Sequence, residues 1–222
     1  MGRIEGVFDD LKAAGHKGFI PYVTAGDPSL VVTADLVCAL EDAGSDVIEL
    51  GVPFSDPLAD GPTIQAAGQR ALANGTTLEG IFKMIEDLRK RTSVPIIVFT
   101  YYNPVHRFGI EAFVERCASI GADGALVTDL PPEESGAYRE RMQAAGLDTV
   151  FLIAPTSRDA RIKAIVNVST GFVYYVSRAG VTGEQASLEA SLVPMTKKIR
   201  SQTDKPLAVG FGISTPEQAN QV

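Results

Sequence analysis

The stretch that decides the fold reads DVIELGVPFSDPLADGP and covers residues 46–62. It begins as a short apolar run typical of a buried strand, and the carboxylate of Glu49 interrupts this run just before a glycine ends it. The following segment, with three prolines and two aspartates, has no helical period and indicates a stiff loop, and Gly61 and Pro62 suit the start of a helix. Glu49 and Asp60 are therefore expected on either side of one opening at the end of the strand. Taken alone, Glu49 can equally be a structural buried acid, and Asp60 a turn or helix-start residue.

Length and composition favour a single domain over residues 1–222, because 222 residues with 45% hydrophobic content can build one sizeable core. The net charge of -7 argues against non-specific binding to nucleic acid. The two cysteines lie far apart and outside any paired motif, which predicts neither a disulfide framework nor a metal knuckle. The chain starts without the apolar core of a signal peptide and contains no apolar run long enough to span a bilayer. We therefore expect a cytoplasmic protein with no membrane partner.

Strand-like and helix-like segments alternate along the whole chain. An amphipathic helix is expected around residues 4–11, and each expected strand after it is followed by a helical pattern. This makes seven βα units. The expected strands cover residues 18–24, 47–50, 95–100, 125–128, 150–153, 172–176 and 207–209.

This alternation predicts an α/β fold with a parallel sheet, because helical crossovers return the chain over the sheet. An open doubly wound sheet and a closed barrel are both compatible with this alternation of strands and helices. We favour a (β/α)8 TIM barrel with an extra N-terminal helix, since polar and glycine-rich turns follow every strand and no strand carries a dinucleotide fingerprint. Closure needs eight strands, and the given chain stops after the seventh strand and part of its helix. Either the natural chain continues through an eighth unit, or a truncated form leaves two strand edges unpaired.

Polar residues concentrate at the expected carboxyl ends of the strands, where barrel enzymes place their active sites. No lysine lies near these ends, so a Schiff-base mechanism lacks its amine, and two isolated histidines argue against a histidine-rich metal site. Acid–base chemistry by carboxylates with support from tyrosines remains. The residues expected at this face are Tyr22, Thr24, Glu49, Asp60, Tyr101, Tyr102, Asn103, Asp129, Tyr174, Tyr175, Ser177 and Arg178.

Two glycine-containing loops follow the last two strands. Residues 178–183 read RAGVTG, which fits either a lid over an active site or a plain connector. Residues 209–216 read VGFGISTP, where two glycines let the backbone approach a ligand closely and a helix begins at Pro216. Barrels often bind phosphate in this neighbourhood, although a tight turn explains the same glycines.

Residues 49–65, ELGVPFSDPLADGPTIQ, closely resemble the signature of the tryptophan synthase alpha chain family, and the resemblance continues through residues 21–28, 101–104, 128–131, 177–183 and 210–213. It implies a lyase of tryptophan biosynthesis that splits indole-3-glycerol phosphate into indole and glyceraldehyde 3-phosphate. The cleavage is a retro-aldol reaction in which the indole ring accepts the electrons, so no metal and no cofactor are expected in this chain. The implied partner is a beta chain that carries pyridoxal phosphate, in an alpha2beta2 heterotetramer.

The resemblance also implies roles for individual residues. Glu49 would be the general acid and base, and Asp60 would stabilise positive charge at the ring nitrogen. Asp56 and the loop around it would face the beta chain, and Arg178 would belong to a closing loop. A stand-alone lyase and a catalytically weak subunit that activates the beta chain are the alternatives. The implied substrate-binding residues are Tyr22, Tyr101, Tyr174, Thr182, Gly183, Phe211 and Gly212, and the family completes its phosphate site beyond residue 222.

Overall fold

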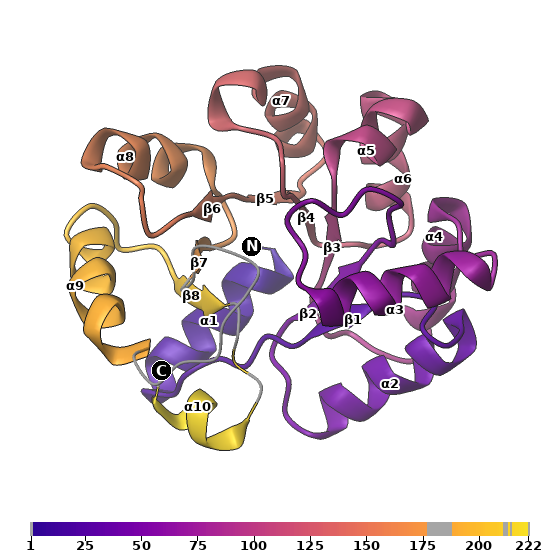
Figure 1. Cartoon of the computed structure of the whole chain (residues 1–222), viewed down its shortest axis with the longest axis horizontal. Coiled ribbons are helices and arrows are strands. Elements are labelled where there is room, and N and C mark those ends of the chain that lie inside the picture. The colour runs from indigo at the N-terminus through magenta and orange to yellow at the C-terminus, as the bar shows by residue number, and fades with distance from the viewer. Residues whose placement is uncertain (1, 177–187, 211–212, 214, 222) are drawn as a thin grey trace. The chain divides into compact units, whose positions relative to one another are not determined.

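The computed structural model describes residues 2–176, 188–210, 213 and 215–221. The chain divides into two compact units, Met1–Asp148 and Thr149–Val222, and each unit is an α/β assembly in which helices connect neighbouring strands (Figure 1). The prediction of one domain over residues 1–222 stays a prediction. Within the described part of the chain, no helix is long and apolar enough to cross a membrane.

The strands of the first unit follow chain order in their sheet, β1-β2-β3-β4, and β5, of which only Asp148 belongs to this unit, comes next in the same order. The first three pairings are parallel, and their register aligns Tyr22 with Glu49, Glu49 with Ile97, and Ile97 with Gly124. These four residues therefore form one level across the sheet. The strands are β1 (Tyr22–Thr24), β2 (Ile48–Gly51), β3 (Ile96–Thr100), β4 (Gly124–Val127) and β5 (Asp148–Val150).

The helices of the first unit begin where the sequence offers a cap or a proline. The side chain of Ser29 accepts a hydrogen bond from the Val32 amide at the start of α2, and α3 has Pro62 in its first turn after Gly61. These caps satisfy or remove the amides that the first helical turn leaves without partners. The helical elements are α1 (Arg3–Ala14), α2 (Leu30–Asp42), α3 (Pro62–Ala73), α4 (Leu78–Leu88), α5 (Tyr102–Phe108), α6 (Ile110–Ser119), the short 3-10 helix η1 (Pro132–Glu134) and α7 (Gly136–Ala144).

Alternate residues of the strands have different surroundings. Ile48 and Leu50 of β2 belong to one continuous apolar core with the buried residues of α2, α4, α6 and α7. Side chains alternate between the two faces of a strand, so Glu49 and Gly51 belong to the face opposite this helix layer. The core therefore anchors β2 through its apolar residues and leaves the other face for Glu49.

The second unit has its own three-stranded sheet, in the order β6-β7-β8, and both of its pairings are parallel. Val173 and Tyr175 of β7 pack into a separate apolar core with Ile162 and Ile165, whereas Tyr174 belongs to the other face. The elements of this unit are β6 (Leu152–Ile153), α8 (Asp159–Val168), β7 (Val173–Val176), α9 (Leu188–Arg200), β8 (Leu207–Gly210) and α10 (Pro216–Gln221).

All seven predicted strands are present, with two corrections to their bounds. The strand predicted at residues 150–153 is two short strands, β5 and β6, which belong to different sheets and are separated at Phe151. The strand predicted at residues 18–24 is confined to Tyr22–Thr24, preceded by Pro21, which has no amide for the ladder. A short helix, α5, was not predicted, and it begins where Asp129 accepts a hydrogen bond from the Tyr102 amide at 2.6 Å.

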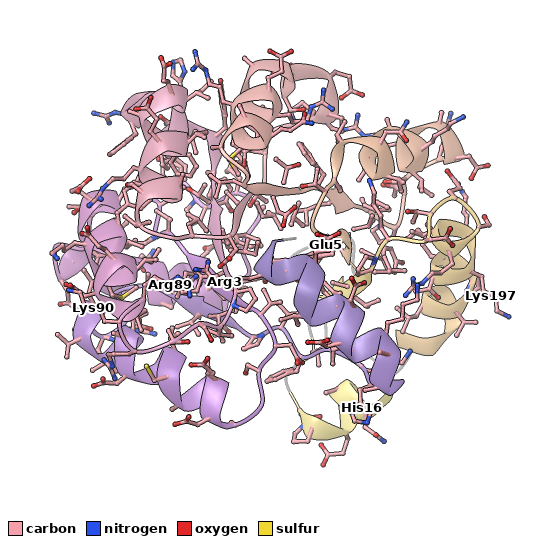
Figure 2. All side chains as sticks on the ribbon, turned by 180° about the vertical axis from the view of Figure 1, so that it is seen from behind. Arg3, Glu5, His16, Arg89, Lys90 and Lys197 are labelled. Atoms are coloured by element: carbon pink, nitrogen blue, oxygen red, sulfur yellow. The ribbon has the colours of Figure 1, made fainter. Side chains whose placement is uncertain are left out.

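An ion network centred on the buried Asp123 attaches the start of α1 to the first unit. Asp123 binds Arg3 through one carboxylate oxygen and Arg89 through the other, both at 2.7 Å, and also accepts a hydrogen bond from the Ile96 amide at 2.8 Å. Arg89 additionally donates to the carbonyls of Val94 and Gly121. Figure 2 shows Arg3 at the start of α1 close to Arg89. Because Asp123 is 8% exposed, its charge depends on these donors for compensation.

We predict that Asp123→Asn lowers the free energy of unfolding by about 3 kcal/mol, because it leaves the half-buried Arg89 without its counter-charge. Urea denaturation would measure this change. The matched control is Asp35→Asn, which removes the exposed ion pair with Arg91 and should change stability little. Equal effects of the two substitutions would contradict the assigned importance of the network.

Candidate functional site

Glu49 is a buried carboxyl group in the middle of β2. Its side chain is 2% exposed, and within the described residues its Oε1 atom has no hydrogen-bond partner. Its neighbours in register are Tyr22 on β1 and Ile97 on β3. Burial, which penalises the charged form, raises the pKa of Glu49 to about 8. The carboxyl is therefore mostly protonated at neutral pH and can act as an acid.

Asp60 ends the loop that connects β2 to α3, and its side chain is 8% exposed. The loop is held at this point by backbone and side-chain bonds: the Asp60 amide donates to the carbonyl of Pro57 at 3.1 Å, and Nε2 of Gln65 donates to the carbonyl of Asp60 at 2.8 Å. The stiff loop predicted from its prolines thus delivers a buried carboxylate next to the start of a helix.

Tyr101 follows β3 and ties this loop to the sheet. Its hydroxyl oxygen accepts a hydrogen bond from the Ala59 amide at 3.0 Å, and its hydroxyl also bonds the Asp60 side chain. The ring centroids of Tyr101 and Phe54 lie 5.3 Å apart. Burial raises the pKa of Asp60, and the hydrogen bond from Tyr101 opposes this rise by stabilising the ionised form. The role of Tyr101 in holding the loop had no signal in the sequence.

The pKa of the Tyr22 phenol responds to both carboxyl groups. Burial raises this pKa, a hydrogen bond from the Thr24 side chain opposes the rise, and the charges of Asp60 and Glu49 add to it. Charges shift a neighbouring pKa in this way only at short range. Tyr22 therefore links Glu49 and Asp60 electrostatically, and Thr24, which was also expected at this face, bonds the same phenol.

The other residues to which the family resemblance gives a role fall into three groups. Tyr174 is 8% exposed on β7 in the second unit, and a Cβ atom on Gly210 would lie 1.9 Å from its hydroxyl oxygen. Asp56 is exposed on the loop after β2, where it accepts a hydrogen bond from Ser55. Outside the described residues lie Arg178, Thr182, Gly183, Phe211 and Gly212.

The described residues contain no group of three histidine, cysteine, aspartate or glutamate side chains that could hold a metal ion. The site instead offers the Glu49 carboxyl, whose pKa burial raises to about 8, the Asp60 carboxyl, which accepts a hydrogen bond from Tyr101, and two phenols whose pKa burial raises further. Parallel βα units with ionisable side chains at and after the strands are the arrangement of an α/β barrel enzyme.

Comparison with known proteins identifies the family. The family model described as tryptophan synthase alpha chain matches residues 8–222, and the chain belongs to this family. A curated tryptophan synthase alpha chain from Geotalea uraniireducens is 49% identical over 222 residues, which are all of this chain and 83% of that protein.

Solved structures confirm the TIM-barrel fold. The tryptophan synthase subunit alpha from Legionella pneumophila is 38% identical and superimposes with a TM-score of 0.90 over all of this chain and 82% of its own. A tryptophan synthase complex from Pyrococcus furiosus is 39% identical, with a TM-score of 0.83 over 92% of this chain and 81% of its own. Members of the family are lyases that cleave indole-3-glycerol phosphate into indole and glyceraldehyde 3-phosphate in tryptophan biosynthesis, and the alpha chain needs no cofactor.

The raised pKa of Glu49 predicts a pH-dependent stability. Between about pH 4.5 and about pH 8 the folded state binds a proton that the unfolded state has released, so the stability falls as the pH rises through this range. We expect Glu49→Gln to remove this pH dependence. At neutral pH the variant then avoids a loss in the free energy of unfolding that is on the order of 3 kcal/mol in the parent protein. Urea denaturation at about pH 5 and about pH 8 measures it.

Glu79→Gln is the control for this prediction, because Glu79 is an exposed acid on α4. It should leave the slope of the parent protein unchanged. Parallel stability curves for Glu49→Gln and the parent would show that Glu49 titrates normally.

Proposed function

We propose that Glu49 and Asp60 catalyse the cleavage of indole-3-glycerol phosphate in this chain. The observation that carries the proposal is the environment of Glu49: a carboxyl that is 2% exposed, has no hydrogen-bond partner for Oε1 among the described residues, and has a pKa of about 8. Such a group is a proton donor at neutral pH that can also take a proton back, as general acid–base catalysis requires.

These two residues account for every proton transfer in the reaction, and the indole ring accepts the electrons of the broken bond. Glu49 donates its proton to ring carbon C3, and the carboxylate of Asp60 stabilises the positive charge that develops at the ring nitrogen. The Glu49 carboxylate then removes the proton from the glycerol hydroxyl next to the ring. The carbon–carbon bond breaks, its electrons return to the ring to give indole, and the hydroxyl carbon becomes the aldehyde of glyceraldehyde 3-phosphate.

Substrate binding is proposed for the residues that the family resemblance indicates. Tyr22 and Tyr101 are proposed to line the place of the indole ring; the hydrogen bond of Tyr101 with Asp60 and the effect of the Asp60 charge on the pKa of Tyr22 support this. Tyr174 and Thr182 are proposed to bind the substrate, and three backbone amides are proposed to bind its phosphate. These amides belong to Gly183, Phe211 and Gly212.

The proposed partner is a tryptophan synthase beta chain, which carries pyridoxal phosphate and uses the indole, in an alpha2beta2 complex. The exposed loop after β2 supports this assignment, because Leu58 is 89% exposed beside the exposed Asp56. Exposed apolar side chains next to charged ones are typical of protein interfaces. Arg178 is proposed to take part in loop closure. We also propose a cytoplasmic location, where this pathway's enzymes and two unpaired cysteines are expected.

For the catalytic pair we predict that Glu49→Gln and Asp60→Asn each lower the rate of indole release by about a hundred- to ten-thousand-fold. A single-turnover assay of indole formation measures the rate. The controls are Glu79→Gln and Asp87→Asn, which change exposed acids of α4 and should retain the parent rate. Near-parental turnover in either site variant would reject the role of that residue.

For the partner surface we predict that Asp56→Asn weakens binding of the beta chain about tenfold, because it removes a charge from the proposed contact loop. Titration calorimetry with purified beta chain measures the dissociation constant. Asp87→Asn is the control on a different surface. Unchanged affinity of the Asp56 variant would place the contact elsewhere.

A further inference from the structure

The side chain of Tyr22 lies across the end of β2. Tyr22 pairs in register with Glu49, yet a Cβ atom on Gly51, two residues further along β2, would lie 1.9 Å from the Tyr22 hydroxyl oxygen and 2.4 Å from its Cζ atom. Residues 49 and 51 share a face of the strand, so the ring runs along that face from the level of Glu49 to the level of Gly51. Only glycine at position 51 leaves room for it.

The ring of Tyr22 reaches across β2 to β3. Phe99 is the register partner of Gly51 on β3, and the Tyr22 and Phe99 rings meet edge to face with centroids 5.3 Å apart and an interplanar angle of 84°. The Thr24 side chain also bonds the Tyr22 hydroxyl. Three contacts from three strands therefore define the position of one ring, an arrangement typical of a rigid wall.

This wall lies on the carboxyl-terminal side of Glu49. Parallel strands present the same end to a common mouth, and Tyr22 occupies the space between Glu49 and the level of Gly51, where β2 ends. The side chain of Glu49 is 2% exposed. An aromatic ring in this position excludes water from a carboxyl beneath it, and exclusion of water disfavours the charged form.

We propose that Tyr22, seated over Gly51, is a positioning residue of the site, and that its ring keeps water from Glu49 so that Glu49 meets the substrate as a neutral acid. The proposal deepens the proposed function, since it rests on Glu49 as the acid. The ring, rather than the hydroxyl, carries this role. Gly51 is then required by function because a side chain there would displace the ring.

The other titratable groups around Glu49 do not provide an alternative in the described part of the chain. The pKa of Tyr22 on β1 responds to the charges of Glu49 and Asp60, and Tyr101, after β3, interacts with Asp60 and Tyr22. Among the described residues, burial is the cause that raises the pKa of Glu49. Removal of the wall is therefore the direct way to change the titration of Glu49.

A similar arrangement recurs in the second unit. Tyr174 on β7 pairs in register with Ala208 on β8, and a Cβ atom on Gly210, again two residues further along, would lie 1.9 Å from the Tyr174 hydroxyl oxygen. The same offset between tyrosine and glycine thus gives the same packing in both sheets. In both sheets a glycine two residues beyond the register partner leaves the space that the tyrosine ring occupies.

The test follows the titration of Glu49 itself in the folded protein. Infrared difference spectra recorded over a range of pH follow the carboxyl band of Glu49, which is assigned by its loss in Glu49→Gln. The change of this band with pH gives the midpoint of the Glu49 titration. We expect a midpoint of about 8 in the parent and in Tyr22→Phe, which keeps the ring. Tyr22→Ala and Gly51→Ala should lower the midpoint by about one pH unit or more, because water reaches the carboxyl. The alkaline limb of indole release should move with it.

Matched controls separate this role from a loss of folding. Gly136→Ala, at a glycine whose added Cβ meets nothing within 4 Å, should leave the midpoint and the melting temperature unchanged. In a protein that already carries Tyr22→Ala, Gly51→Ala should reduce stability much less than it does in the parent. The added Cβ atom clashes with the Tyr22 ring, and the ring is absent in that background. This double-mutant comparison reports the packing even if one single variant folds poorly.

Two outcomes would overturn the proposal. One is a folded Tyr22→Ala protein whose Glu49 midpoint equals that of the parent, and the other is a midpoint in Tyr22→Phe that falls as far as in Tyr22→Ala. The proposed catalytic role fails separately, if Glu49→Gln retains indole release while the midpoint still responds to the ring.

Discussion

The insertion of one carboxyl group into an otherwise apolar strand is the constraint around which the first unit is arranged. Oε1 of Glu49 has no hydrogen-bond partner among the described residues, and an unsatisfied buried polar atom costs about 1–3 kcal/mol. The neighbouring Ile48 and Leu50 offset this cost, because both are fully buried in the core that the helices form with the sheet. The unfavourable group is therefore carried by a strand whose other face is anchored.

The two carboxyl groups of the site differ because their surroundings differ. Glu49 has burial alone, which favours its neutral form, whereas Asp60 has burial together with a hydrogen bond from Tyr101 that favours its ionised form. Divergent environments for two acids are the usual physical basis for assigning one as proton donor and the other as a fixed negative charge. The irregular loop after β2 makes this possible, since it brings Asp60 to the sheet by a path that a strand could not follow.

Much of the fold could be predicted from local pattern, because short apolar runs, caps and prolines act within a few residues. Cross-strand relations could not be, since they depend on register. Gly51 was interpreted only as the end of a strand, although it also provides the space for the ring of Tyr22. The bond between the Tyr101 hydroxyl and the Ala59 amide joins residues far apart in sequence, and the break at Phe151 divides an apolar run that looked continuous.

The ion network of Asp123 has a consequence for the order of events during synthesis. Arg3 lies 120 positions before the carboxylate that it binds, so the first helix leaves the ribosome long before its counter-ion exists. Until β4 has emerged, α1 can form its own turns but cannot complete this attachment. The leading helix therefore lacks its attachment to Asp123 throughout the translation of the first three strands.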